Sequence, residues 1–140
     1  MEGIYTLVLF LPKKKKIRVG KLGCFLFPKG YYVYVGSGMR NLEHRISRYF
    51  RIRKKKWHID YLVSNSIIKK VVFAKTRKKV ECNLSICLEK FSHRLWKKFG
   101  SMDCKCYSHL HYFKKLKDVD NALKKSYRKL KLKSFVWKSG

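Results

Sequence analysis

Apolar side chains along this chain recur at two spacings, one typical of strands and one typical of helices. Three long runs, at 4–11, 31–35 and 67–74, are rich in β-branched and aromatic residues and predict strands. Pro28-Lys29-Gly30 predicts a turn before the second run, because proline presets its backbone angle and glycine accepts positive φ. Shorter extended segments are expected at 17–19, 23–27 and 110–113.

The strand at 31–35 is expected to stop at Gly36-Ser37-Gly38, after which Asn41 can cap a helix over 42–53. Further helices are predicted at 57–62, at 79–91 and from about Asp118, which is expected to cap the last one. These elements predict an α/β fold of the α+β kind, a small antiparallel or mixed sheet flanked by helices in a sandwich. No repeat or Ser/Gly-rich linker interrupts the chain, so residues 1–140 are expected to form a single domain with a basic C-terminal helix.

Charge changes this picture more than any other property. The 36 Lys and Arg residues face 8 Asp and Glu, which gives a formal net charge of +28 at pH 7. Self-repulsion at this charge destabilises the folded state, so a polyanionic partner is expected, with nucleic acid favoured over membrane. The alternative is a solvated lysine surface of the kind found in thermophiles, but the acidic partners of such ion-pair networks are scarce here.

Two further observations bear on the compartment. The apolar run at 4–12 is too short to cross a bilayer, and Glu2 stands where a signal peptide would be basic. The five cysteines are odd in number, which favours free thiols in a reducing interior over a disulfide scaffold. Cytoplasmic localisation is therefore expected, without a membrane partner.

Two tripeptides at the strands carry the first chemical signal. Gly3-Ile4-Tyr5 and Tyr34-Val35-Gly36 resemble the paired motifs of the GIY-YIG nuclease superfamily, and Arg45 follows on the next helix. Glu81 lies on a later helix, where the superfamily places its metal-binding Glu. The closer resemblance is to a compact branch known as domain of unknown function 123, found mostly in archaea and thermophiles. Its residues here are Arg18-Val19-Gly20, Tyr31 to Ser37, Trp57 to Leu62, Glu81-Cys82 and Gly100 to Leu110.

This resemblance implies an endonuclease that hydrolyses phosphodiester bonds, with DNA favoured as substrate and RNA as the other candidate. It implies one Mg²⁺ or Mn²⁺ ion at Glu81, a phosphate clamped by Arg45, and Tyr5 or a tyrosine-polarised water as the nucleophile system. Departures from the superfamily's pattern are an extended segment between the two tyrosine motifs and the lack of an obvious late Asn.

The residues themselves agree with these roles. Strand alternation places Tyr5 and Tyr34 on faces that two antiparallel strands can bring together, although cross-strand packing is the ordinary role of strand tyrosines. Arg45 borders the apolar stripe of its helix, and its planar guanidinium suits two phosphate oxygens at once. Arg40 and Arg48 compete with it for this role.

Glu81 also borders an apolar stripe, whereas Glu89 points away from the centre of that stripe. A carboxylate at a buried edge is a candidate metal ligand, and an ion pair with a neighbouring Lys is its alternative. His58 is a candidate for proton transfer, with His44 as a competitor and surface or core packing as the ordinary role of either. Asp60 is expected to orient His58 or the backbone of the short helix.

Cys104 and Cys106, with His109 and His111 close behind, raise the question of zinc. Their spacing does not match a common ligand pair, so a structural zinc is not expected. The alternative is that these residues line the cleft beside Glu81.

Backbone phosphates are expected to contact the basic residues on and just past the Arg45 helix. These are Arg40, Arg48, Arg51, Arg53, Lys54, Lys55 and Lys56. The C-terminal helix, with Lys124, Lys125, Arg128 and Lys129, is a second candidate, and solvated faces are the alternative for both. The runner-up function is a catalytically inactive DNA- or RNA-binding module of the same fold, and a ribosome- or RNA-associated protein is a third.

Overall fold

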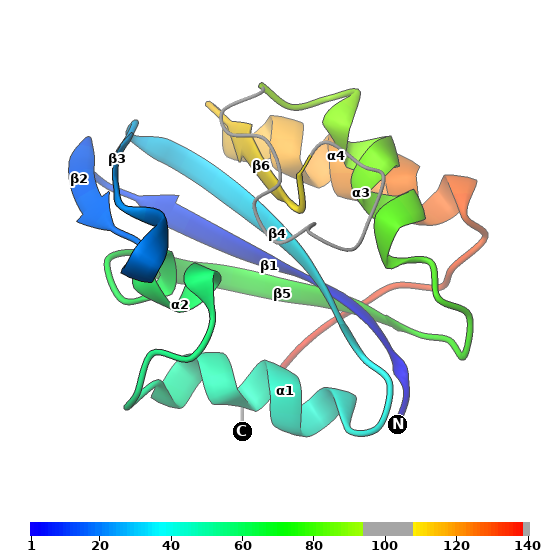
Figure 1. The fold of residues 1–140 in the computed structure, drawn as a ribbon. Coiled ribbons are helices and arrows are strands. Elements are labelled where there is room, and N and C mark those ends of the chain that lie inside the picture. Colours follow the sequence, from blue (N-terminus) through cyan, green and yellow to red (C-terminus); the bar gives the residue numbers. More distant parts are fainter. Residues whose placement is uncertain (94–107, 139–140) are drawn as a thin grey trace.

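A computed structural model describes residues 1–93 and 108–138 of the chain (Figure 1). Its main feature is an antiparallel sheet of five strands in the order β6-β4-β1-β5-β7. These strands are β1 (Gly3–Leu11), β4 (Gly30–Gly38), β5 (Ile67–Lys75), β6 (Leu110–Phe113) and β7 (Phe135–Val136). A separate two-stranded sheet pairs β2 (Lys15–Arg18) with β3 (Cys24–Phe27).

Helices cover both faces of the larger sheet (Figure 1). One face lies under α1 (Leu42–Arg48), the 3₁₀ turn η2 (Tyr49–Arg51), α2 (His58–Val63) and the β2–β3 sheet. A second 3₁₀ turn, η1 (Gly20–Leu22), lies between β2 and β3. The other face lies under α3 (Glu81–Glu89) and α4 (Leu116–Lys129). The result is three layers, with the sheet in the middle.

Strand β1 is buried on both sides because it lies at the centre of this sandwich. Its odd-numbered side chains Tyr5, Leu7 and Leu9 pack under α1 and α2, and the even-numbered Ile4 and Val8 pack under α3 and α4. All seven residues from Gly3 to Leu9 are buried. The predicted α+β fold, a sheet flanked by helices, is therefore confirmed, with the β2–β3 hairpin set apart as its own small sheet.

The expected end of the second long strand was wrong. Strand β4 continues through Gly36-Ser37-Gly38 and pairs with β1 along its whole length, so that Gly38 lies opposite Gly3. Glycine has a low strand propensity, but each residue of this stretch pairs with a residue of β1, and this pairing outweighs the local preference.

Helix starts were predicted with mixed success. Asn41 caps α1 as expected, because its side-chain oxygen accepts a hydrogen bond from the backbone N–H of His44 at 3.0 Å. Asp118, by contrast, does not cap the last helix: α4 begins at Leu116 after Lys115, and Asp118 lies within the first turn. Strand β7 was not predicted, since two exposed residues carry no pattern.

Asp60 fastens the short helix α2 to its surroundings. Its Oδ2 atom accepts hydrogen bonds from the backbone N–H groups of Lys56 at 2.7 Å and Trp57 at 2.9 Å. Both carboxylate oxygens also bind Arg48, with Nη1–Oδ1 at 2.9 Å and Nη2–Oδ2 at 2.5 Å. Burial alone would raise the pKa of Asp60, but these hydrogen bonds hold it below the usual value. Asp60 therefore orients the helix backbone, one of its two expected roles.

Within residues 1–93 and 108–138, the helices are all too short or too polar to cross a bilayer.

Candidate active site

The two motif glycines have steric reasons for being glycine. Tyr5 lies opposite Gly36 in the β1–β4 ladder, and a Cβ atom on Gly36 would overlap the ring and hydroxyl of Tyr5. A Cβ atom on Gly3 would likewise overlap the backbone carbonyl oxygen of Ala74 on β5. The glycines thus allow the Tyr5 ring to lie across β4 and let β1 and β5 approach closely at this end of the sheet.

Tyr5 is held by a second tyrosine from the helix layer. Its hydroxyl lies 2.5 Å from that of Tyr49, and the two rings are tilted at a centroid distance of 5.7 Å. Tyr5 is 2% exposed. Burial raises its pKa well above the usual value, and the neighbouring phenols Tyr49 and Tyr34 add to this rise. At neutral pH Tyr5 is therefore a buried, protonated phenol that does not reach solvent.

Tyr34 lies on the same face of the sheet and is partly exposed. It pairs with Leu7, two residues along β1 from Tyr5, so the two tyrosines are diagonal neighbours as alternation predicted. Burial raises the pKa of Tyr34, followed by the charges of Tyr49 and Glu81, whereas Arg45 acts to lower it. The Tyr34 hydroxyl is thus protonated at neutral pH, and the charges of both Arg45 and Glu81 affect its pKa.

Arg45 is positioned by stacking and by one backbone hydrogen bond. Its guanidinium lies over the Trp57 ring, 4.7 Å from the centroid, and Nη1 donates to the carbonyl oxygen of Ser37. The side chain is neither fully buried nor fully exposed. One end of the guanidinium fork is therefore anchored at the end of β4.

Ser37 also binds Glu81 from the opposite layer. The Ser37 hydroxyl donates to Oε2 of Glu81 at 2.9 Å, and the Glu81 side chain keeps 30% of its surface exposed. Glu81 is the first residue of α3 on the other face of the sheet. A single residue of β4 thus brings the guanidinium of Arg45 and the carboxylate of Glu81 together across one strand.

His109 is a member of this cluster whose place beside Glu81 had been only an alternative to zinc binding. Its backbone carbonyl accepts from the N–H of Val35 at 2.9 Å, which places it where β6 begins to pair with β4. Nδ1 of the buried imidazole lies 3.3 Å from Oε1 of Glu81 without forming a hydrogen bond within the described chain. Nε2 lies 3.6 Å from the sulfur of Cys82.

Two hollows lie near this end of the sheet, and the smaller one borders Glu81. One has a volume of about 200 Å³ and is lined by Glu81, Ser37 and Ile4 together with the exposed lysines Lys78 and Lys79. The other, of about 630 Å³, adjoins the preceding residues of the chain. Its basic lining residues are Arg40, Lys75 and Arg77. Of the predicted phosphate contacts, Arg40 is the one in this lining, whereas Lys75, Arg77, Lys78 and Lys79 were missed because a lysine-rich loop is ordinary in so basic a chain.

The donor atoms beside the smaller hollow suit a divalent cation. Oε1 of Glu81 faces Nδ1 of His109 at 3.3 Å, and Glu81 lines the smaller hollow while Nδ1 of His109 is buried without a hydrogen bond to the described residues. One carboxylate and one imidazole imply an ion that keeps most of its water ligands, and imidazole favours Mn²⁺ relative to Mg²⁺. Within the described ranges no group of three or more His, Cys, Asp or Glu side chains is arranged to hold a metal.

The other predicted site residues are distributed around this centre. His58 is exposed at the start of α2, and its competitor His44 is exposed on α1. Arg48 differs from the expected phosphate ligand, because its guanidinium binds the fully buried Asp60 and stacks 4.2 Å from the Trp57 centroid. The positive charge of Arg48 is therefore balanced by Asp60 within the fold.

The basic segment past α1 is solvent-exposed throughout. Its members are Arg51, Arg53, Lys54, Lys55 and Lys56, and two of them lie against aromatic rings, Lys55 near Tyr61 and Lys56 near Trp57. Cys104 and Cys106 of the possible zinc cluster lie outside the described residues, as do Gly100 to Tyr107 of the segment that carries the resemblance. Cys24 and Cys87 carry free thiols, whereas Cys82 is disulfide-bonded, so the expectation of free thiols was wrong for Cys82. Cytoplasmic localisation stays a prediction.

Comparison with known proteins gives one match. A family model described as "Domain of unknown function DUF123" matches residues 4–132. This span includes the two tyrosine strands, Arg45, Glu81 and His109. No curated protein and no solved structure matches the chain.

Proposed function

We propose that this chain, which belongs to the DUF123 family, is a divalent-metal-dependent endonuclease of the GIY-YIG kind that hydrolyses phosphodiester bonds of DNA. The observation that carries the proposal is that Arg45 and Glu81 both bond to Ser37, three residues along β4 from Tyr34, with a solvent-accessible hollow next to Glu81. Phosphodiester hydrolysis needs a cationic clamp, a metal ligand and a group that orients water, and these side chains supply one of each.

Arg45 is suited to the phosphate because only one end of its guanidinium is bonded to Ser37. The remaining N–H groups can bind a phosphate oxygen and offset the charge that develops on it. Glu81 and His109 would hold the divalent ion. When bound, that ion supplies Lewis-acid polarisation of the phosphate and an acidic water molecule.

The tyrosines divide the remaining work between them. Tyr34, partly exposed and protonated, donates its hydroxyl proton in a hydrogen bond that orients the attacking water or a phosphate oxygen. Tyr5 is a positioning residue, since it is buried against Tyr49 and does not reach the substrate. This assignment refines the expected nucleophile system to a water oriented by Tyr34. His58 stays a prediction for proton transfer.

Positive charge around the hollows supports a nucleic-acid substrate. Lys78 and Lys79 line the cavity that borders Glu81. Arg40, Lys75 and Arg77 line a second cavity formed by preceding residues of the chain, and a phosphate backbone laid along both cavities would pass the carboxylate. The exposed basic segment 51–56 extends this surface beyond α1.

The test is a cleavage panel with matched variants. Plasmid DNA, branched DNA, single strands and structured RNA are each incubated with Mg²⁺, Mn²⁺ or EDTA. Wild-type protein should cleave DNA only with metal, and Glu81→Ala should lower the rate by about 10²-fold or more while DNA binding is retained. Glu89→Ala on the same helix is the control and should cleave like wild type.

A catalytically inactive binding module is the second candidate, and the net charge of +28 favours it equally. Tight binding without cleavage of any substrate, in either metal, would replace the nuclease proposal with this one. A strong preference for structured RNA over duplex DNA would instead favour an RNA-associated protein.

A further inference from the structure

The disulfide-bonded sulfur of Cys82 lies beside the two candidate metal ligands. Cys82 follows Glu81 in the first turn of α3, and its side chain is partly exposed. The free thiols of the described chain are Cys24 and Cys87, so the sulfur bonded to Cys82 belongs to a residue outside the described ranges. A change in the oxidation state of Cys82 therefore takes place next to Glu81, where a reductant can reach it.

His109 connects this sulfur to the Glu81 carboxylate through the two nitrogens of one ring. Nε2 forms a hydrogen bond with Sγ of Cys82 at 3.6 Å, and Nδ1 lies 3.3 Å from Oε1 of Glu81. His109 is 4% exposed, and its Nδ1 atom has no hydrogen-bond partner among the residues that the structure describes. The position of the ring proton is therefore decided by Cys82 on one side and Glu81 on the other.

The oxidised sulfur determines which nitrogen carries that proton. A disulfide sulfur has no hydrogen and can only accept, so Nε2–H of His109 is the donor in the bond to Cys82. A neutral imidazole has one N–H group, which leaves a lone pair on Nδ1. This lone pair lies beside a carboxylate oxygen of Glu81, which also accepts only. In the disulfide form both ligands thus present lone pairs, as binding of a divalent cation requires.

Reduction gives the sulfur a proton of its own. A dithiol reductant attacks the disulfide, and its second thiol then closes the reductant's own disulfide. Two electrons and two protons pass to the protein, so that Cys82 and the sulfur bonded to it each become a thiol. The Cys82 S–H can then donate to Nε2 of His109, which leaves the ring proton on Nδ1. Nδ1–H can donate to the charged carboxylate of Glu81, a stronger bond than one to sulfur.

We propose that Cys82 is a redox-modified residue whose disulfide sets the tautomer of His109 and thereby the affinity of Glu81 and His109 for a divalent cation. The disulfide form binds the cation tightly. In the thiol form the two ligands bond to each other, and the proton on Nδ1 competes with the cation for the same lone pair. The inference rests on the proposed function in one respect, since it takes Glu81 and His109 as the metal ligands.

Nitrogen chemical shifts of His109 test the tautomer without metal or substrate. ¹⁵N-labelled protein is compared by NMR after oxidation with glutathione disulfide and after reduction with dithiothreitol, at about pH 8. The His109 proton should lie on Nε2 in the oxidised protein and on Nδ1 in the reduced protein. Cys82→Ser carries a hydroxyl that can donate to Nε2, so it should show the reduced pattern under both conditions. Cys24→Ser, at an exposed free thiol, should change like wild type.

Mn²⁺ binding, followed by electron paramagnetic resonance after the small thiols are removed, tests the consequence for the metal. Oxidised wild type should bind Mn²⁺ about tenfold more tightly than reduced wild type, the size of a typical effect from a group that orients a metal ligand. Cys82→Ser should bind with the reduced affinity under both conditions. Glu81→Ala should abolish the difference between the two forms.

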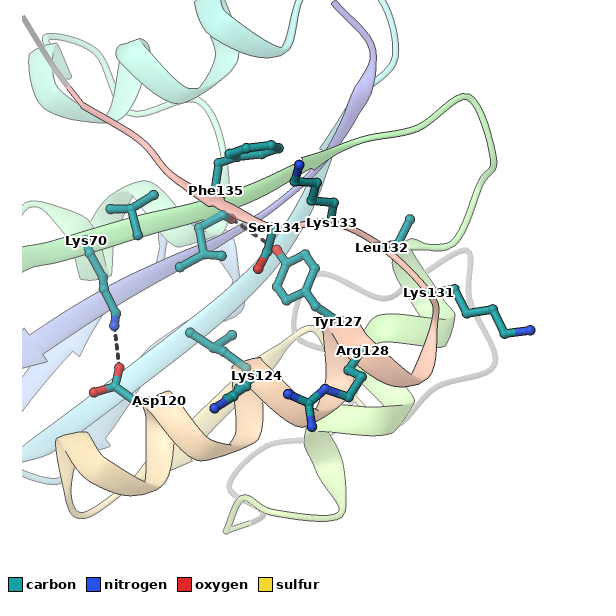
Figure 2. A pocket seen from close by; sticks show the side chains of 13 residues that line it. Lys70, Asp120, Lys124, Tyr127, Arg128, Lys131, Leu132, Lys133, Ser134 and Phe135 are labelled. Carbon is teal, nitrogen blue, oxygen red and sulfur yellow. Dashed lines mark hydrogen bonds and ion pairs between the residues drawn. The ribbon is translucent and has the colours of Figure 1, made fainter.

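An acid in a different hollow provides the control for Mn²⁺ held elsewhere on the surface. Asp120 lies between α4 and the segment that leads into β7, where it is bound to Lys70 (Figure 2). The described lining of this hollow contains no cysteine or histidine. Asp120→Asn should therefore keep the full difference in Mn²⁺ affinity between oxidised and reduced protein.

Four results would overturn the inference. These are a disulfide that survives dithiothreitol, a His109 proton that stays on one nitrogen, equal Mn²⁺ affinity of the two forms, and no Mn²⁺ binding by either form. Failure of the nuclease proposal is distinguishable from all four. A protein that changes tautomer and Mn²⁺ affinity with its oxidation state but cleaves no nucleic acid would keep this inference and refute the nuclease. Metal-dependent cleavage with an unchanged Mn²⁺ affinity would do the reverse.

Discussion

The two faces of the sheet differ in how deeply their ion pairs are buried. Under α2, Asp60 is fully buried and receives four hydrogen bonds, two of them from Arg48. On the α4 side, Asp120 meets Lys70 at the surface, where the aspartate side chain is 48% exposed. The carboxylate of the first pair is part of the core, whereas the second pair is exposed to solvent.

Buried tyrosine hydroxyls differ between the faces as well. Tyr127, on the α4 side, bonds to the carbonyl of Val72 and to Thr6, both at 3.1 Å, so its hydroxyl ends on the sheet itself. Tyr5, on the α1 side, bonds to Tyr49, which lies among Arg45 and Arg48. Burial raises the pKa of Tyr49 to about 12, although its hydrogen bond with Tyr5 and the two arginines act against this rise.

This contrast teaches that burial of a polar group does not by itself indicate function. On the α4 face the Tyr127 hydroxyl and the His111 imidazole are neutral and bonded to their immediate neighbours. On the α1 face the hydroxyls of Tyr5 and Tyr49 bond to each other and lie near the guanidinium groups of Arg45 and Arg48. The partners of a buried tyrosine, and not its burial, distinguish the candidate site from the ordinary core.

The largest expected effect comes from breaking the buried ion pair. Asp60→Ala leaves Arg48 without its partner and removes the cap of α2, so the free energy of unfolding should fall by about 3–5 kcal/mol. Asp120→Ala at the exposed pair should lower it by no more than about 1 kcal/mol. Urea denaturation measures both. Equal losses in the two variants would contradict the contrast between the faces.

Acid should destabilise the α3–α4 side through His111. Burial lowers the pKa of His111 to about 3, followed by the effect of His109. Between about pH 6.5 and 3 the unfolded chain binds a proton that the folded chain refuses, so stability falls by about 1.4 kcal/mol per pH unit.

His111→Gln should flatten this dependence between pH 6 and pH 4, as followed by urea denaturation at each pH. The neutral imidazole is held with Nε2–H donating to Ser85, since the Ser85 hydroxyl proton is already given to the carbonyl of Ser108 at 2.5 Å. His44→Gln, at an exposed histidine, is the control. Parallel pH profiles of wild type and His111→Gln would show that the buried imidazole does not cause the loss.

Removing one tyrosine hydroxyl from each face tests the same comparison with a smaller expected loss of stability. Tyr5→Phe and Tyr127→Phe should each lower the free energy of unfolding by about 1 kcal/mol. If the nuclease proposal holds, Tyr5→Phe should also lower kcat about tenfold with little change in KM, because Tyr5 positions the site without touching substrate. Tyr127→Phe should leave cleavage unchanged. A loss of cleavage in both variants would mean that stability, and not position, accounts for the effect.

The smallest effect is expected at the exposed pair. Asp120→Asn should change the free energy of unfolding by less than about 0.5 kcal/mol, because solvent screens the ion pair. Chemical denaturation at two salt concentrations measures the change. A loss of more than about 1 kcal/mol would show that the exposed pair is not screened by solvent.

Local sequence rules predicted most of the sheet and the helix that carries Arg45. Runs of β-branched and aromatic residues located β1, β5 and β6, and Asn41 marked the start of α1 correctly. Strand alternation also placed Tyr5 and Tyr34 on one face. These successes depend on short-range preferences and on the two-residue repeat of a strand.

Features that depend on pairing between distant segments could not be predicted in this way. Strand β4 runs through its glycines because β1 lies beside it, and the Tyr5–Tyr49 bond depends on how the end of α1 packs on the sheet. His109 reaches Glu81 only because β6 begins beside Val35. The wrong cap at Asp118 shows the same limit, since packing of α4 and not the nearest acid decides where the helix begins.

Ser37 sets the spacing between the two charged groups in an unusual way. Its main chain holds Arg45 on one side of the sheet and its hydroxyl holds Glu81 on the other. In the proposed nuclease, the spacing between the phosphate clamp and the metal ligand is therefore set by the width of a single polypeptide strand. Sliding of either helical layer over the sheet would break one of the two bonds to Ser37, so this spacing depends on both layers staying in place.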